Sequence, residues 1–374
     1  MFHKIKGQDT ALHILNTALE HDRVAQAYLF HGIDGVGKFT AALYFGMALN
    51  CLAKSEFRPC GVCSSCHKFL ALDHPDLIYI FPSSNLELTP DGEIKNSEAE
   101  KEYEAFIRNK VETPWQDYLF KSKVMIRRES INWLIKRLSL SAYEANYRIC
   151  IVEDAGLMNT ETANAFLKTL EEPPQDTVII LLTENLSSLL PTIVSRCQPI
   201  YFQPVAPTVI EGILTENFGI PTEKARTASR IADGSVKRAI YLAQVESSEL
   251  RDRAFEIFRL AAGDKELAFF NTLQGQTTKL TGEAALETLR YVGLFAGDLN
   301  LAQTAPEQIV NVDKKDFLLE TRAALPPEKE ENLADAVLDL LLRIEDLSRK
   351  VRGNVNLQLV MLNLYLGLGR IFRG

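Results

Sequence analysis

The residues best suited to chemistry lie in a glycine-rich segment near the start of the chain. Residues 32–38 fit the pattern G-x-x-x-x-G-K, which cradles nucleotide phosphates when it follows a strand and opens a helix. Glycines let backbone N–H groups converge on phosphate oxygens, and the lysine neutralises the β and γ phosphates. The predicted phosphate-binding residues are Gly32, Gly35, Gly37 and Lys38. A glycine-rich turn that binds no nucleotide remains the alternative.

The position after this lysine is poorly suited to magnesium. It normally carries Ser or Thr, whose hydroxyl ligates Mg²⁺, but here it is Phe39. Thr40 lies one residue further on, rotated by about 100° around the helix. We therefore expect the binding of ATP and Mg²⁺ to be impaired, with the hydroxyl of Thr40 as the substitute for the missing one.

Two acidic residues follow the apolar run 149–152 and form a second candidate for phosphate chemistry. In an active site of this kind, one carboxylate holds the hydrated metal and the next orients the attacking water. The usual order is Asp then Glu, whereas this chain has Glu153 then Asp154. The longer and shorter side chains are exchanged, which argues against efficient hydrolysis. Without the phosphate loop, two solvent-facing acids would be an equally good interpretation.

A cluster of cysteines predicts a structural metal site. Cys51, Cys60, Cys63 and Cys66 form the pattern C-x8-C-x2-C-x2-C. Four thiolates can surround Zn²⁺ tetrahedrally, and a full set of sulfurs leaves no open position for catalysis. His67 and His74 are nearby alternative ligands, and a group of reduced, partly buried thiols is the competing interpretation.

Arg196 lies in the segment 189–197, shortly after the apolar run 178–182. Its guanidinium is planar and always charged, so it could stabilise a γ-phosphate in the site of another subunit. Taken alone, a salt-bridged surface arginine is the default interpretation.

The elements that must position these residues alternate along the first half of the chain. Apolar runs at 27–30, 76–80, 149–152 and 178–182 are typical of strands, and helical spacing follows them. Such alternation predicts an α/β fold with a mostly parallel sheet covered on both faces. Residues 83–121 are polar and are interpreted as a surface insertion, and after Pro204 the pattern is helical.

Length and composition limit the remaining possibilities. A chain of 374 residues is too long for one core, and 46% hydrophobic with 24% charged residues indicates an ordered globular protein. No apolar run approaches the roughly 18–20 residues of a membrane span, and no secretory signal opens the chain, so we expect a cytoplasmic protein. The net charge of −8 argues against a broad basic surface for DNA.

Together these segments resemble the bacterial DNA polymerase III clamp loader, a branch of the AAA+ ATPases. The resemblance covers roughly residues 7–240 and is most specific at 164–174 and 190–197. It implies an AAA+ module at 1–205, with the zinc module at 51–66 and the insertion at 83–121. A helical lid at 206–245 and an all-α collar domain at 246–374 would follow.

Within that family the pattern is similar to the delta-prime branch, which lends an arginine to a neighbour's ATP. Motor subunits would carry Arg where this chain has Lys237, and Arg238 fits the delta-prime habit of an arginine one place later. The resemblance implies that Lys237, Arg238 and Thr183 belong to this chain's own nucleotide site. It also implies that Arg196 acts in trans, at the nucleotide site of a neighbouring subunit. It implies motor and delta-like subunits as partners, with the sliding clamp and primed DNA reached through the assembly.

Two other functions stay open at this point. One is an ATP-hydrolysing motor of the gamma/tau type, with Thr40 replacing the missing magnesium ligand. The other is a nucleotide-free, zinc-stapled scaffold that only binds partner proteins. For the delta-prime interpretation, the chain's own ATPase activity would be weak or absent.

Overall fold

The chain folds into two compact units. The computed structural model describes residues 4–54, 57–84, 86–89, 92–116, 118, 120, 124–244, 249–274, 281–351 and 356–373. The first unit comprises Met1–Phe218 and Ala232–Tyr241, and the second comprises Gly219–Ile231 and Leu242–Gly374. The predicted boundary at 245/246 lies outside the described residues.

The first unit is built around a parallel sheet in the order β2-β3-β4-β1-β5. Its register pairs His31 with Thr183 and Val152 with Leu181. All neighbouring strands are parallel, so their carboxyl ends share one edge. The strands are β1 (Ala27–His31), β2 (Leu77–Ile80), β3 (Arg148–Val152), β4 (Thr177–Thr183) and β5 (Gln198–Tyr201).

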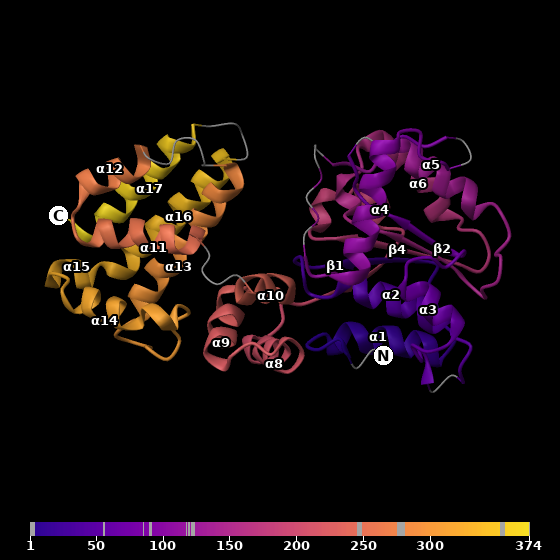
Figure 1. Ribbon diagram of the computed structural model, residues 1–374, viewed down its shortest axis with the longest axis horizontal. Helices are drawn as coiled ribbons and strands as arrows, with labels where there is room; N and C mark the ends of the chain where they lie inside the picture. Colours follow the sequence, from indigo (N-terminus) through magenta and orange to yellow (C-terminus); the bar gives the residue numbers. More distant parts are fainter. Residues whose placement is uncertain are drawn as a thin grey trace. The chain divides into compact units, whose positions relative to one another are not determined.

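Helices cover both faces of this sheet, as the sequence predicted. The helices of the unit are α1 (Asp9–Glu20), α2 (Lys38–Leu49), α3 (Ser64–Leu70), α4 (Ser97–Glu112), α5 (Arg128–Leu138), α6 (Thr160–Glu171), α7 (Pro191–Val194) and α8 (Pro207–Phe218). Figure 1 shows α1, α2 and α3 on one side of the sheet and α5 and α6 on the other.

Two separate cores follow from the alternation of side chains along each strand. Tyr28 and Phe30 of β1 join the core beneath α1 and α2, while Ala27 and Leu29 join the core beneath α5 and α6. Because β3 and β4 are buried on both faces, their sequences read as continuous apolar runs.

Edge strand β5 and insertion helix α4 are among the elements of this unit that the sequence did not predict. Edge strand β5 was not predicted, because it is short, contains Pro199 and buries only Ile200 fully. The polar insertion contains α4, whose N-cap Asn96 accepts a hydrogen bond from the backbone N–H of Glu98 at 2.8 Å. Acidic residues in its first turn favour the same helix end.

The second unit is all-helical in its described residues. A buried cluster containing Phe258, Phe295 and Tyr365 lies between its longest helices. The helices are α9 (Thr222–Ile231), α11 (Glu249–Ala262), α12 (Glu266–Gln274), α13 (Gly282–Leu301), α14 (Lys315–Ala323), α15 (Pro327–Glu331), α16 (Leu333–Val351) and α17 (Leu357–Phe372). Helix α10 (Val236–Gln244) belongs to the first unit as far as Tyr241. None of the helices found in the described ranges is both long and apolar enough to cross a membrane.

Candidate functional site

The predicted phosphate loop connects β1 to α2. Gly32, Gly35 and Gly37 all have positive φ angles, and Gly37 is the N-cap of α2. Lys38 is the first residue of that helix. The strand, loop and helix that this motif requires are therefore present.

The ammonium group of Lys38 is held by the loop itself. Its Nζ donates to the carbonyl oxygens of Gly32 at 2.6 Å and Ile33 at 2.8 Å, and the residue is only 8% exposed. Burial lowers the pKa of Lys38 below its usual value, although Asp34 and other nearby carboxylates act in the opposite direction. A phosphate would have to compete with these carbonyl groups for the lysine.

The first turn of α10 lies directly against the loop. The carbonyl of Gly35 accepts hydrogen bonds from the backbone N–H groups of Val236 at 3.0 Å and Lys237 at 3.3 Å. A Cβ at Gly35 would lie 2.3 Å from Ser235 Oγ, so only glycine allows this approach. The Oγ of Ser235 also accepts from the N–H of Arg238 at 3.2 Å.

Lys237 also pairs with the loop through its side chain. Its Nζ lies 2.9 Å from Asp34 Oδ2. Burial acts to raise the pKa of Asp34, but Lys237 and Lys38 outweigh it, and the pKa lies below its usual value. Both lid residues predicted for the nucleotide site are thus on the first turn next to the phosphate loop.

Glu153 and Asp154 follow β3 at the same edge of the sheet. Both carboxylate oxygens of Glu153 have protein partners: Lys110 Nζ lies 2.6 Å from Oε1, and the Tyr79 hydroxyl donates to Oε2. Asp154 adopts a left-handed backbone conformation. Burial and the carboxylates of Glu153, Asp34 and Glu184 raise the pKa of Asp154 to about 6.

These surroundings do not fit a divalent metal ion. Phe39 presents a ring where the ligand hydroxyl belongs, and this ring lies 5.2 Å from that of Tyr79. Lys110 Nζ lies 4.2 Å from the centre of the Phe39 ring. Thr40 is half-buried in α2, one residue beyond the ligand position. The hydroxyl expected to bind magnesium is therefore missing, and the carboxylate of Glu153 is already engaged.

Thr183 ends β4 beside the start of the phosphate loop, as its pairing with His31 requires. Its hydroxyl donates to the carbonyl of Asn185 at 3.1 Å and lies 3.2 Å from Ser188 Oγ. The side chain therefore stabilises the turn after β4.

Arg196 lies at the opposite edge of the sheet. It lies two residues before the start of β5, which runs parallel to β1, whereas the phosphate loop follows the carboxyl end of β1. Its Nε donates to Glu171 Oε1 at 2.8 Å and its Nη1 to the carbonyl of Thr192 at 2.8 Å. The residue is exposed despite these bonds. The fold thus separates Arg196 from its own chain's phosphate loop.

The four cysteines converge as a metal centre would require. Their sulfur atoms all lie within 4.8 Å of one another, and Cys60 Sγ and Cys66 Sγ are 4.0 Å apart. Tetrahedral Zn–S bonds of about 2.3 Å would place sulfurs roughly 3.8 Å apart. This cluster can bind a metal ion.

Backbone groups prepare one of these thiols for metal binding. Cys60 Sγ accepts hydrogen bonds from the N–H groups of Val62 at 3.4 Å and Cys63 at 3.3 Å, and these bonds lower its pKa to about 6. The alternative ligand His74 is engaged elsewhere, since its Nδ1 accepts from the N–H of Asp76 at 3.1 Å.

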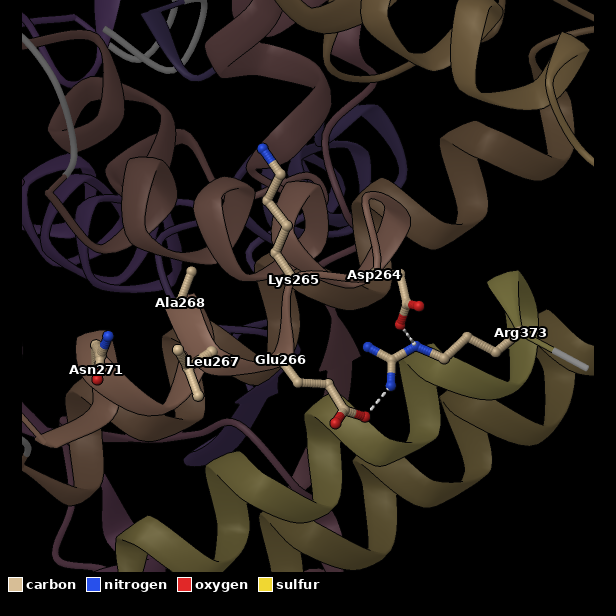
Figure 2. A pocket seen from close by; sticks show the side chains of 7 residues that line it. All are labelled: Asp264, Lys265, Glu266, Leu267, Ala268, Asn271 and Arg373. Carbon is tan, nitrogen blue, oxygen red and sulfur yellow. Dashed lines mark hydrogen bonds and ion pairs between the residues drawn. The ribbon is translucent and has the colours of Figure 1, made fainter.

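A surface hollow in the second unit contains none of the predicted site residues. Figure 2 shows Arg373 pairing with Asp264 and Glu266 along its wall. The distance from Arg373 Nε to Asp264 Oδ1 is 2.6 Å, and Nη2 donates to the Tyr365 hydroxyl at 2.8 Å. These charges compensate one another and join the end of α17 to the start of α12.

Sequence reasoning missed Lys110 and Tyr79, although both contact Glu153. The only available signal was the helical spacing of apolar residues at 103, 106 and 107, with Lys110 on the same face. That spacing indicates a packed helix but does not reveal its partner.

Comparisons with known proteins show which family the sequence resembles. Residues 7–206 match the family described as DNA polymerase III, delta subunit. The DNA polymerase III subunit delta′ of Bacillus subtilis is 28% identical over 362 residues, which are 96% of this chain and 96% of that protein. The DNA polymerase III subunit tau of Salmonella typhimurium is 28% identical over 246 residues, covering 64% of this chain and 32% of that protein.

A solved DNA polymerase III gamma subunit-related protein from Thermotoga maritima is 16% identical with a TM-score of 0.43, over 96% of this chain and 99% of that one. The family match spans more than half of the sequence. The chain therefore belongs to the DNA polymerase III delta-subunit family.

Proposed function

We propose that this chain is a delta-prime-like subunit of the bacterial DNA polymerase III clamp loader, which helps load the sliding clamp on primed DNA. The observation that carries the proposal is the similarity to a delta′ subunit over 96% of both chains. The motor subunit tau is similar over a shorter part, 64% of this chain.

In this role Arg196 acts on the nucleotide of a neighbouring subunit. It is exposed and stands at the sheet edge opposite its own phosphate loop, which supports action in trans. A guanidinium beside a γ-phosphate stabilises the charge that develops during phosphoryl transfer. Motor and delta-like subunits would be the partners in the ring, and the sliding clamp and DNA would be reached through them.

The chain's own phosphate loop would bind nucleotide weakly and hydrolyse it slowly or not at all. Lys38 and Lys237 already have protein partners, and Phe39 replaces the hydroxyl that ligates magnesium. Gly32, Gly35, Gly37, Thr40, Thr183 and Arg238 complete the candidate nucleotide site. Glu153 and Asp154 occupy the degenerate catalytic positions.

The remaining parts of the chain have supporting roles in this proposal. The four-cysteine cluster holds structural Zn²⁺, which links Cys51 to Cys60, Cys63 and Cys66. Residues 206–245 act as a lid, and residues 246–374 act as the collar that holds the subunit in a hetero-oligomeric ring. This replication role would place the protein in the cytoplasm.

The test is the ATPase rate of the reconstituted clamp loader with primed DNA. Arg196→Ala should slow turnover by on the order of 10³-fold, because arginine fingers contribute 10³–10⁵ in phosphoryl transfer. Arg128→Ala is the matched control, since Arg128 is likewise exposed and paired with a carboxylate, that of Glu161. An unchanged rate for the Arg196 variant in a fully assembled complex would overturn the trans role.

One observation favours a second candidate, a scaffold that binds no nucleotide. Lys38 and the first turn of α10 close the phosphate loop with protein groups alone. Equilibrium dialysis of the intact chain with labelled ATP separates the two functions, because the scaffold would retain none. Phe39 lacks the side-chain hydroxyl that would ligate magnesium, which disfavours the third function, an ATP-hydrolysing motor.

A further inference from the structure

The insertion helix α4 presents a packed face that ends in a lysine. Tyr103, Phe106, Ile107 and Lys110 recur at the spacing of one helix face. The three hydrophobic members pack against the core beneath α1 and α2. Lys110 is the next member of the same face, and its side chain is only 14% exposed.

Aromatic stacking fixes this face at the carboxyl end of β2. Phe81 directly follows the strand, and its ring stacks on that of Phe106 with centroids 3.9 Å apart and planes inclined by 23°. The Tyr103 ring stacks on the same Phe81 at 5.4 Å. Reciprocal backbone hydrogen bonds between Ser83 and Met125 close the base of the insertion. The position of Lys110 is therefore set by the core rather than by a free surface loop.

The lysine lies at the edge of the sheet where a nucleotide-hydrolysing site would bind its metal ion. Its Nζ lies 2.6 Å from Glu153 Oε1 and 4.2 Å from the centre of the Phe39 ring. Glu153 is itself only 20% exposed and accepts a second bond from Tyr79. A largely buried carboxylate of this kind requires a compensating cation.

We propose that Lys110 is a tethered cation that takes the place of the divalent metal ion beside the phosphate loop. Phe39 fills the position of the missing metal ligand. The Lys110 ammonium supplies, next to Glu153, the positive charge that a metal ion would otherwise supply. The role of the 83–121 insertion is thus to silence this chain's own site. The inference concerns only this local site and does not depend on Arg196 or on assembly into a clamp loader.

Removing the lysine should uncover a latent metal site, and Tb³⁺ is the probe. This hard cation binds carboxylate oxygens, and Tyr79, which touches Glu153, would sensitise its luminescence. In the full-length chain with zinc bound at the cysteine cluster, Lys110→Met should bind Tb³⁺ at least about tenfold more tightly than the unaltered chain, since the carboxylate of Glu153 loses its cationic partner. Methionine keeps an aliphatic stem over Phe39 while removing the charge.

Three variants connect this gain to the proposed geometry. Lys110→Arg keeps the cation and should behave like the unaltered chain. The double variant Lys110→Met/Glu153→Gln should lose the gain in Tb³⁺ affinity. The double variant Lys110→Met/Tyr79→Phe should show a lower sensitised Tb³⁺ luminescence. Lys101→Ala is the matched control, because Lys101 is an exposed lysine on the same helix.

Two results would overturn the proposal. One is unchanged Tb³⁺ affinity in a folded Lys110→Met variant, with folding verified by circular dichroism and thermal unfolding. The other is failure of both Lys110→Met and Lys110→Ala to fold, because the lysine would then serve stability rather than replace an ion.

Discussion

Arg196 bonds to Glu171, with Nε and Oε1 2.8 Å apart, and thereby joins the end of α6 to the turn between α7 and β5. The pair remains in contact with solvent, since the two side chains are 32% and 46% exposed. Such pairs contribute only about 0–1 kcal/mol to the free energy of unfolding. Glu171 can therefore orient the guanidinium while leaving it able to exchange its partner for a phosphate.

Replacing Glu171 with Ala should separate these two roles of the arginine. We expect the free energy of unfolding of the isolated chain to fall by less than about 1 kcal/mol. The ATPase rate of the assembled loader should stay unchanged or rise, in contrast to Arg196→Ala. Glu161→Ala, which removes the partner of Arg128, is the matched control for chemical denaturation. A loss of activity as large as that of Arg196→Ala would make Glu171 part of the trans site.

The cysteine cluster predicts a stoichiometric metal. Elemental analysis should find about one zinc ion per chain, and Cys60→Ser or Cys66→Ser should remove it and destabilise the first unit. Co²⁺ substitution should give the intense visible bands of tetrahedral thiolate coordination. Cys197→Ala is the control, because this thiol is buried outside the cluster and should leave the metal content unaltered. A metal-free chain with full stability would contradict the assignment.

Gly35→Ala should loosen the contact between the phosphate loop and α10. The substitution meets both a positive φ of 76° and a Cβ position 2.6 Å from Lys237 Cβ, so we expect about 1–3 kcal/mol of destabilisation. Amide hydrogen exchange at Val236 and Lys237 should accelerate. Gly219→Ala isolates the backbone contribution, because Gly219 has φ 64° and nothing within 4 Å of its Cβ position. Equal effects of the two substitutions would show that the contact with α10 contributes nothing.

Asp76 should make folding sensitive to acid. Its buried carboxylate accepts hydrogen bonds from the N–H groups of Tyr143, Glu144 and Ala145 at 2.7, 2.8 and 2.9 Å. Burial acts to raise its pKa, but these bonds and His74 outweigh it, so the pKa lies below its usual value.

The corresponding stabilisation is present above the unfolded-state pKa of about 3.9 and is lost as the pH falls through the lower folded-state pKa. Asp76→Asn should cost about 1.5–3 kcal/mol at pH 7, and the difference from the unaltered chain should shrink below about pH 4. Urea unfolding at several pH values measures this difference. A constant difference from pH 7 to pH 3 would contradict the role of the charge.

Sequence patterns located the central strands well because these strands are buried on both faces. The runs at 149–152 and 178–182 lie within β3 and β4. Edge strand β5 escaped because only one of its residues is fully buried, which leaves no apolar run to detect. Element prediction therefore failed where burial, its main signal, was weak.

The candidate site was predictable in its position but not in its partners. Parallel strands bring the phosphate loop and Glu153 to one edge, so their proximity followed from the predicted topology. The bond from Lys110 joins residues 43 positions apart, and it depends on how Phe106 stacks on Phe81. No local pattern encodes such a long-range packing arrangement, so the sequence predicted the missing hydroxyl at Phe39 but not the ammonium beside it.

Because the cation next to Glu153 is carried on a side chain, it cannot be stripped by a chelator or diluted away. The charge balance at this edge of the sheet is set by the polypeptide itself and does not depend on the concentration of free magnesium in the cell.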